Sequence, residues 1–152
     1  MRRILLVLLM GAVLSASACA GGRAGEMAAS PSKATLLRER ATEYWTAAVK
    51  ADYEKMFYLF DPFFQAKTNK YKFLGSRGGV KYHSFEIKDV KVEENVGQVR
   101  VSIVYSVPKI KFKTQEFSKP ETPAEFEEKW LFVGDNWYKE YQDETSTGTP
   151  SY

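Results

Sequence analysis

The stretch EYWTAAVKADYEKMFYLFDPFF, residues 43–64 of this 152-residue chain, decides the fold because it contains three helical segments in succession. Apolar residues before and within it recur three or four positions apart, at Leu37, Ala41, Tyr44 and Ala48, and the stripe is widened by Trp45 and Val49. This spacing indicates a helix with one buried face, whose start Ser32 or Thr35 is expected to cap. Asp52 and the pair Asp61-Pro62 predict two further helix starts, since Asp favours the N-cap and Pro the first helical position.

The second half of the chain alternates as β-strands do. In residues 82–93 the apolar positions change parity between Ile87 and Val90, which predicts a bulge near Lys88 and Asp89. Residues 99–107 alternate cleanly, and Pro108 predicts a bend or an edge position beyond them. We expect residues 114–123 to form a loop, and residues 126–132 and 137–141 to form a closing hairpin around Gly134. Helices followed by an antiparallel meander predict an α+β fold.

The helical stretch and the closing segment EEKWLFVGDNWYKEY, residues 127–141, together resemble the NTF2-like superfamily, which has the SnoaL or ketosteroid isomerase-like fold. The matching positions are Tyr44 and Trp45, Asp52-Tyr53, and Trp130 with Gly134, Asp135 and Trp137. The resemblance implies a cone in which N-terminal helices pack on a curved, mainly four-stranded antiparallel sheet. It implies no activity, because this fold supports enzymes and non-enzymes alike.

The N-terminus has the pattern of an export signal. Arg2 and Arg3 precede an apolar run over residues 4–14, and small residues then lead to Cys19. The stretch ASAC, residues 16–19, resembles the lipobox of bacterial lipoproteins, with Ala16 where leucine is usual. The alternative is an ordinary secretory signal that leaves Cys19 as a free thiol. A lone cysteine has no partner in the chain for the disulfide that an oxidising compartment favours, so we interpret Cys19 as the lipid attachment site.

These features divide the chain into a signal peptide (1–18), a flexible tether (19–33), one domain (34–143) and a disordered tail (144–152). The lipobox resemblance implies a protein of the bacterial cell envelope, anchored in the membrane by its N-terminal lipid. Ala20 follows the cysteine where aspartate would favour the inner membrane. In a Gram-negative host the resemblance therefore implies the periplasmic side of the outer membrane.

Charge and composition argue against several classes of function. The chain has 22 basic and 19 acidic residues, but two of the basic residues lie in the signal peptide, so the remaining chain has a net charge of only +1. Nucleic-acid binding needs a concentrated basic face, and we expect none. A metal site is not expected either, because there is one histidine, and the pairs Glu93-Glu94 and Glu127-Glu128 are interpreted as solvated residues. No cofactor is expected.

Few residues of the sequence are candidates for catalysis. His83 is the only histidine, and it shares parity with Phe85 and Ile87, so it could point into the cone. We interpret it as structural, because no second histidine exists to pair with it. No serine has a base at a suggestive spacing, and Cys19 is assigned to the anchor. The sequence therefore gives no catalytic residue.

Aromatic and basic residues offer two candidate binding surfaces. A pocket in the cone would be lined by Tyr44, Tyr58, His83, Tyr105, Trp130 and Tyr138. The favoured alternative is that these rings fill the core. Lys109, Lys111 and Lys113 share one face of the stretch PKIKFK and either block edge pairing or form a basic patch, with a second basic stretch over residues 67–81.

The sequence thus predicts a lipid-anchored, non-enzymatic binding module. Its partner would be an envelope protein or a small apolar ligand, and a homodimer through the open face of the sheet is a further option. The alternative is a small enzyme of the ketosteroid isomerase or polyketide cyclase type, with an acid or His83 acting in the cone.

Overall fold

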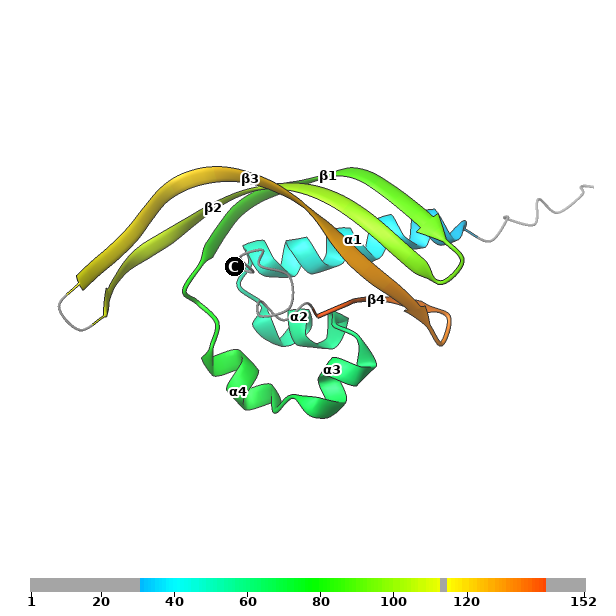
Figure 1. Cartoon of the computed structure of the whole chain (residues 1–152), viewed down its shortest axis with the longest axis horizontal. Helices are drawn as coiled ribbons and strands as arrows, with labels where there is room; N and C mark the ends of the chain where they lie inside the picture. The colour runs from blue at the N-terminus through cyan, green and yellow to red at the C-terminus, as the bar shows by residue number, and fades with distance from the viewer. Residues whose placement is uncertain (1–30, 113–114, 142–152) are drawn as a thin grey trace, which may run out of the picture.

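The computed structural model describes residues 31–112 and 115–141, in which four helices precede four strands (Figure 1). The helices are α1 (Lys33–Val49), α2 (Tyr53–Leu59), α3 (Pro62–Lys67) and α4 (Lys70–Gly75). The strands are β1 (Lys81–Glu93), β2 (Val96–Phe112), β3 (Gln115–Val133) and β4 (Asn136–Lys139). No helix in the described residues is long and apolar enough to cross a membrane. Cys19, Lys113 and the tail over 144–152 lie outside the described residues.

The helix starts follow the predicted capping pattern. Ser32 Oγ accepts a hydrogen bond from the backbone N–H of Thr35 at 3.1 Å, and the Asp52 and Asp61 carboxylates cap α2 and α3 in the same way. Helix α4 is an addition to the three predicted helices. It begins at Asn69, whose side-chain oxygen accepts from the backbone of Lys72 at 3.1 Å, and it buries Phe73.

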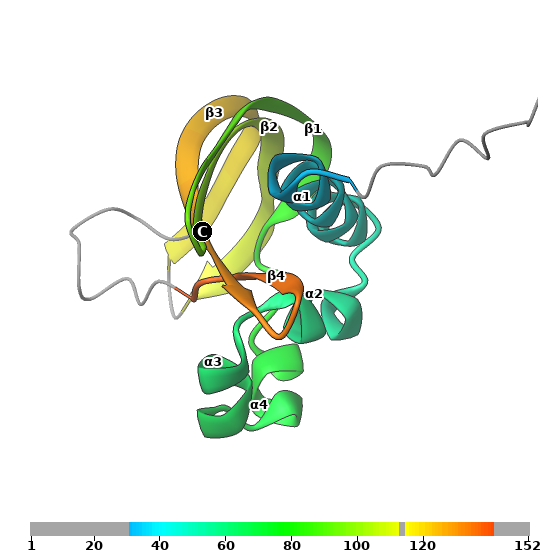
Figure 2. The same ribbon diagram turned by 90° about the vertical axis from the view of Figure 1, so that its right-hand side faces the viewer.

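The four strands form one antiparallel sheet in sequence order, β1-β2-β3-β4. The sheet arches over α1, and the view along α1 in Figure 2 places this helix inside the curve. Helices α3 and α4 lie below α2, on the side away from the sheet (Figures 1 and 2). The predicted α+β fold, with helices packed on a curved four-stranded antiparallel sheet, is confirmed. The β1–β2 register shifts between Ile87 and Asp89, which confirms the predicted bulge.

The predicted loop over residues 114–123 is wrong, because β3 begins at Gln115 and pairs with β2. Pro120 and Pro123 are tolerated because β4 pairs with β3 only from Trp130 to Val133, so the rest of β3 is an edge of the sheet. Since β1 begins opposite Ser106, strands β2 and β3 continue beyond it as a two-stranded arm, residues 107–112 and 115–119 (Figure 1). The β2–β3 register is irregular on both sides of Val107, close to the bend predicted at Pro108.

The core lies between α1 and the concave face of the sheet. Its members are fully or nearly fully buried; on α1 they are Leu37, Ala41, Tyr44, Trp45, Ala47 and Ala48. Val99, Val101, Ile103 and Tyr105 of β2 oppose them, so the clean alternation of this strand is confirmed. Gly97 permits the close approach of α1, because a Cβ atom there would lie 2.3 Å from Leu37 Cδ2. The helix and sheet positions of the domain are therefore set by one shared apolar interior.

Candidate functional site

The interior of the cone is filled by the protein's own rings. Tyr44 of α1 lies edge-on to Trp45, Phe60 and Trp130, with ring centroids 5.5, 5.6 and 6.2 Å apart. Trp45 in turn packs against Tyr82 at 5.3 Å and against Phe85 and Phe126. Burial raises the pKa of the Tyr44 hydroxyl well above its usual value and that of Tyr82 to about 12, so both phenols stay neutral.

A buried ion pair lies among these rings. Glu128 of β3 is 4% exposed, and its Oε1 accepts from the ammonium of Lys139 in β4. Its Oε2 accepts from the indole N–H of Trp130 at 3.2 Å. The Lys139 ammonium also lies over the Tyr44 ring, 4.1 Å from the centroid. Both carboxylate oxygens are thus engaged, and the buried charge has a partner of opposite sign.

The interpretation of Glu128 as a solvated residue is wrong. Glu128 pairs with Val99 in the β2–β3 register, and Val99 belongs to the inward set of β2. Partners in an antiparallel ladder share a face, so Glu128 points into the cone, whereas Glu127 points outward and is exposed. In the sequence, Glu128 has the same parity as Phe126, Trp130 and Phe132. This apolar pattern was the signal that could have placed its carboxylate on the buried face.

The structure does not bring the six candidate pocket residues around one space. Tyr44, Tyr105 and Trp130 are buried in the core, and the Tyr105 hydroxyl oxygen accepts a hydrogen bond from the Lys119 ammonium. Tyr58 lies on the outer side of α2, 50% exposed, with its hydroxyl 3.1 Å from Lys70 Nζ. Tyr138 is half-buried, with the Arg40 guanidinium 5.8 Å from its ring centroid.

The His83 side chain lies on the outer side of the sheet. The β1–β2 register shifts between Tyr82 and Ser84, so the parity that His83 shares with Phe85 in the sequence does not hold in space. Its Nε2 lies 2.8 Å from Ser106 Oγ, and its Nδ1 lies 3.4 Å from a carboxylate oxygen of Glu121. Ser106 and Glu121 both lie more than 20 positions from His83 in the sequence, which is why these partners were missed.

The two basic stretches belong to different parts of the fold. Lys109 lies on the arm and is paired with Glu116 at 2.6 Å, while Lys111 pairs with Glu116 in the backbone register. The second stretch, with Lys67, Lys70, Lys72, Arg77 and Lys81, runs from α3 through α4 to the start of β1. Lys70 is paired with Glu54, at 2.8 Å. Among the described side chains, no ion pair links the two stretches.

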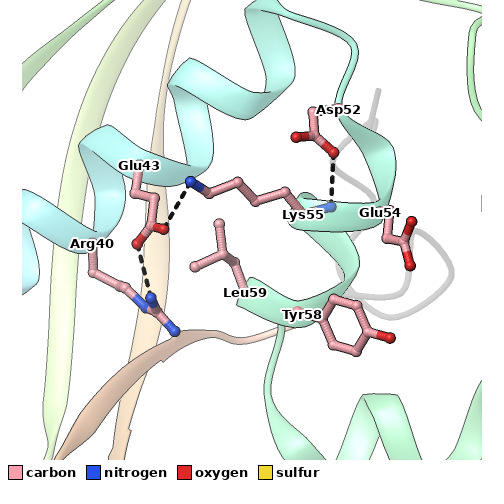
Figure 3. Close-up of a pocket in the computed structure, with 7 residues that line it drawn as sticks. All are labelled: Arg40, Glu43, Asp52, Glu54, Lys55, Tyr58 and Leu59. Atoms are coloured by element: carbon pink, nitrogen blue, oxygen red, sulfur yellow. Dashed lines mark hydrogen bonds and ion pairs between the residues drawn. The ribbon is translucent and has the colours of Figure 1, made fainter.

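A hollow of about 400 Å³ opens on the surface between α1 and α2 (Figure 3). Its lining residues are mostly charged: Arg40, Glu43, Asp52, Glu54, Lys55, Tyr58 and Leu59. Glu43 bridges the two helices, because its carboxylate oxygens lie 2.8 Å from Arg40 Nη1 and 3.0 Å from Lys55 Nζ (Figure 3). A second hollow of about 220 Å³ shares Arg40 and Glu43 and extends along α1 to Asp135 and Trp137.

Electrostatics hold this bridge in its charged form. Burial by itself would raise the pKa of the Glu43 carboxyl, but hydrogen bonds and positive charge from Lys55 and Arg40 bring it below its ordinary value of 4.5. Arg40 is further oriented by a bond from its Nε to the Trp137 carbonyl at 3.1 Å. The hollow therefore presents fixed charges of both signs beside the Tyr58 ring.

Comparison with known proteins defines the fold and little more. No family model matches the sequence, and no curated protein is similar to it. Among solved structures, a SEC-C motif containing protein from Psychrobacter arcticus has a TM-score of 0.53 at 11% identity, over 82% of this chain and 67% of that one. A SEC-C motif containing protein from Rhodopseudomonas palustris has a TM-score of 0.49 at 12% identity, with 70% and 73% covered.

A protein of the NTF2-like family from Streptomyces avermitilis is also similar, with a TM-score of 0.45 at 9% identity over 68% of this chain and 88% of that one. At these identities the likeness concerns the fold alone. Among the described residues, no group of three or more His, Cys, Asp or Glu side chains is placed to hold a metal ion.

Proposed function

We propose that this chain is a lipid-anchored protein of the bacterial envelope, and that its NTF2-like domain binds a partner without using the cone for catalysis. The observation that carries the proposal is the packed interior. Where a cone-type enzyme needs an accessible acid or base, Tyr44, Trp45 and Trp130 are in ring contact and Glu128 has both oxygens engaged. A general base must reach a substrate proton, and a carboxylate held by Lys139 and Trp130 inside a packed core does not.

The outer surface supports binding instead. The hollow between α1 and α2 contains a half-exposed tyrosine, and tyrosines with an apolar ring and a polar tip are favoured in interfaces. Three of its charged side chains, Arg40, Glu43 and Lys55, are joined by ion pairs. We assign the partner as an envelope protein, with a second copy of this chain as the other option.

The anchor is tested by metabolic labelling with a radioactive fatty acid. We expect label on the wild-type protein and none on Cys19→Ser, because the thiol is the only attachment point of the thioether type in the chain. Label on the Cys19→Ser protein would contradict the anchor, and it would leave the binding proposal to be judged separately.

The binding surface is tested by affinity purification of the anchored protein from membranes. Tyr58→Ala should lose the co-purifying partner, whereas Tyr71→Ala should retain it, since Tyr71 is 78% exposed but does not line the hollow. Equal recovery of the partner with both variants would exclude this surface.

One observation favours the alternative, an isomerase or cyclase. Glu128 is a buried acid, and Trp45, whose ring lies 5.2 Å from the Lys139 ammonium that pairs with Glu128, has a buried Nε1 donor without a hydrogen-bond partner in the described structure. An acid and a free donor are the parts that such enzymes use. A turnover assay with β,γ-unsaturated ketones tests it: activity that Glu128→Gln abolishes in a folded protein would replace the binding proposal.

A further inference from the structure

Three side chains from three neighbouring strands meet at the base of the arm. His83 comes from β1, Ser106 from β2 and Glu121 from β3. His83 Nε2 lies 2.8 Å from Ser106 Oγ, and His83 Nδ1 lies 3.4 Å from Glu121 Oε1. A hydroxyl within hydrogen-bond reach of a base, with that base oriented by a third group, is the arrangement that activates a nucleophile.

Irregularities in the sheet bring these residues together. Tyr82 pairs with Tyr105 and Ser84 with Val104, so His83 is the extra residue of a bulge in β1. On the other side, the pairs Tyr105–Thr122 and Val107–Lys119 leave Ser106 facing two residues of β3, Pro120 and Glu121. Bulges redirect side chains out of the regular ladder, and they are frequent beside active sites.

The chemistry of the two contacts favours one assignment of roles. The Glu121 carboxylate lies 3.4 Å from Nδ1 and can only accept, so it favours the tautomer with the His83 proton on Nδ1. Nε2 is then free to accept the Ser106 O–H, as a general base must. The His83 side chain is 23% exposed and that of Glu121 65%, so a reagent from solvent can reach the group.

We propose that Ser106 is an activated nucleophile that accepts an acyl group from an activated ester. Ser106 Oγ forms a bond to the carbonyl carbon while its proton passes to His83 Nε2. The bond from that carbon to the leaving oxygen then breaks, and the leaving group takes the proton from His83. The product is an acyl ester on Ser106. This site lies on the outer side of the sheet and goes beyond the binding function proposed for the α1–α2 surface.

The test uses the full chain and a fluorophosphonate, which reports serine nucleophiles by covalent labelling. We expect one adduct, mapped to Ser106 by peptide mass spectrometry and absent from Ser106→Ala. Ser102→Ala is the matched control, because Ser102 lies two pairing positions along the same face of β2 and the only histidine is already engaged. His83→Ala should lower the labelling rate by about 100-fold or more, and added imidazole should restore it.

Glu121 acts through His83 and is a positioning residue. Glu121→Gln should slow labelling, and Glu121→Asp should recover part of the rate, while thermal unfolding of both variants stays near that of the wild type. Absence of an adduct on the folded wild-type chain, an adduct at another serine, or an unchanged rate in His83→Ala would each overturn the proposal.

Discussion

Glu128 is the residue that most changes the view of the cone. It is a carboxylate in an otherwise apolar row of β3, and its two oxygens accept hydrogen bonds from Lys139 and Trp130. A buried pair of this kind contributes little over an apolar pair of the same shape, but breaking it leaves a charge without a partner. Its importance is therefore best measured by removing one side of the pair.

Glu128→Gln should lower the free energy of unfolding by about 3 kcal/mol or more, because the Lys139 ammonium then stays buried without a counter-charge. Urea titration measures the change. Glu86→Gln is the control: it breaks the exposed Glu86–Lys88 pair and should cost less than about 1 kcal/mol. Equal effects of the two substitutions would mean that the interior pair is solvated.

Gly97 offers a second test at the residue scale. In Gly97→Ala the new methyl group would lie 2.3 Å from Leu37 Cδ2 and 3.1 Å from Trp137 Cζ3, so α1 or the Trp137 ring must move. Overpacking of this kind costs about 1–3 kcal/mol. The matched substitution Gly79→Ala meets no atom within 4 Å and should change stability by less than about 0.5 kcal/mol. Wild-type stability of Gly97→Ala in urea would contradict the close approach of α1 to β2.

At the scale of elements, features that depend on neighbouring residues could be predicted from the sequence, whereas pairing between distant segments could not. Asp52 and Asp61 were identified as caps because an Asp N-cap depends on residues three positions away. The bulge near Asp89 was predictable for the same reason, from a parity change within one strand. Strand β3 was missed over residues 115–123, since its pairing with β2 outweighs the turn tendency of Pro120 and Pro123.

The candidate sites likewise differ in whether local spacing or long-range contacts define them. The aromatic core was predicted from α1 and β2, whose spacing shows which face is buried. The contact between His83 and Ser106 joins residues 23 positions apart through two bulges, and no spacing rule indicates it. The hollow beside Tyr58 depends on how α2 turns back on α1 after residue 50, which the sequence does not specify.

The contact between α1 and α2 is expected to depend on pH. The Glu43 pKa is lowered in the native state, so the carboxylate stabilises the fold above its ordinary value of 4.5, and this contribution is lost as the pH falls through the lower native value. When the pH is lowered from neutral to below 4.5, the free energy of unfolding should therefore fall less for Glu43→Gln than for the wild type. Chemical denaturation at several pH values measures it, and Lys55→Met should give an intermediate slope. The same slope in wild type and Glu43→Gln would show that the bridge does not form in solution.

At the scale of the whole molecule, the fold has a packed interior and a surface that carries two candidate sites. The sheet arches over one side of α1, and the rings of both fill the space between them (Figure 2). The α1–α2 hollow and the base of the arm lie outside this core. A domain of this form would act through its surfaces, and its interior would serve stability.

The accessibility of the tryptophans tests the closed interior most directly. The chain has three tryptophans, and Trp45, Trp130 and Trp137 are 2%, 0% and 1% exposed. With a packed interior we expect acrylamide to quench the native fluorescence weakly, to quench it strongly after unfolding in urea, and to show no further protection when apolar ligands are added. Strong quenching of the native protein that an apolar ligand suppresses would show an open, occupied cone and would contradict a binding role confined to the outer surface.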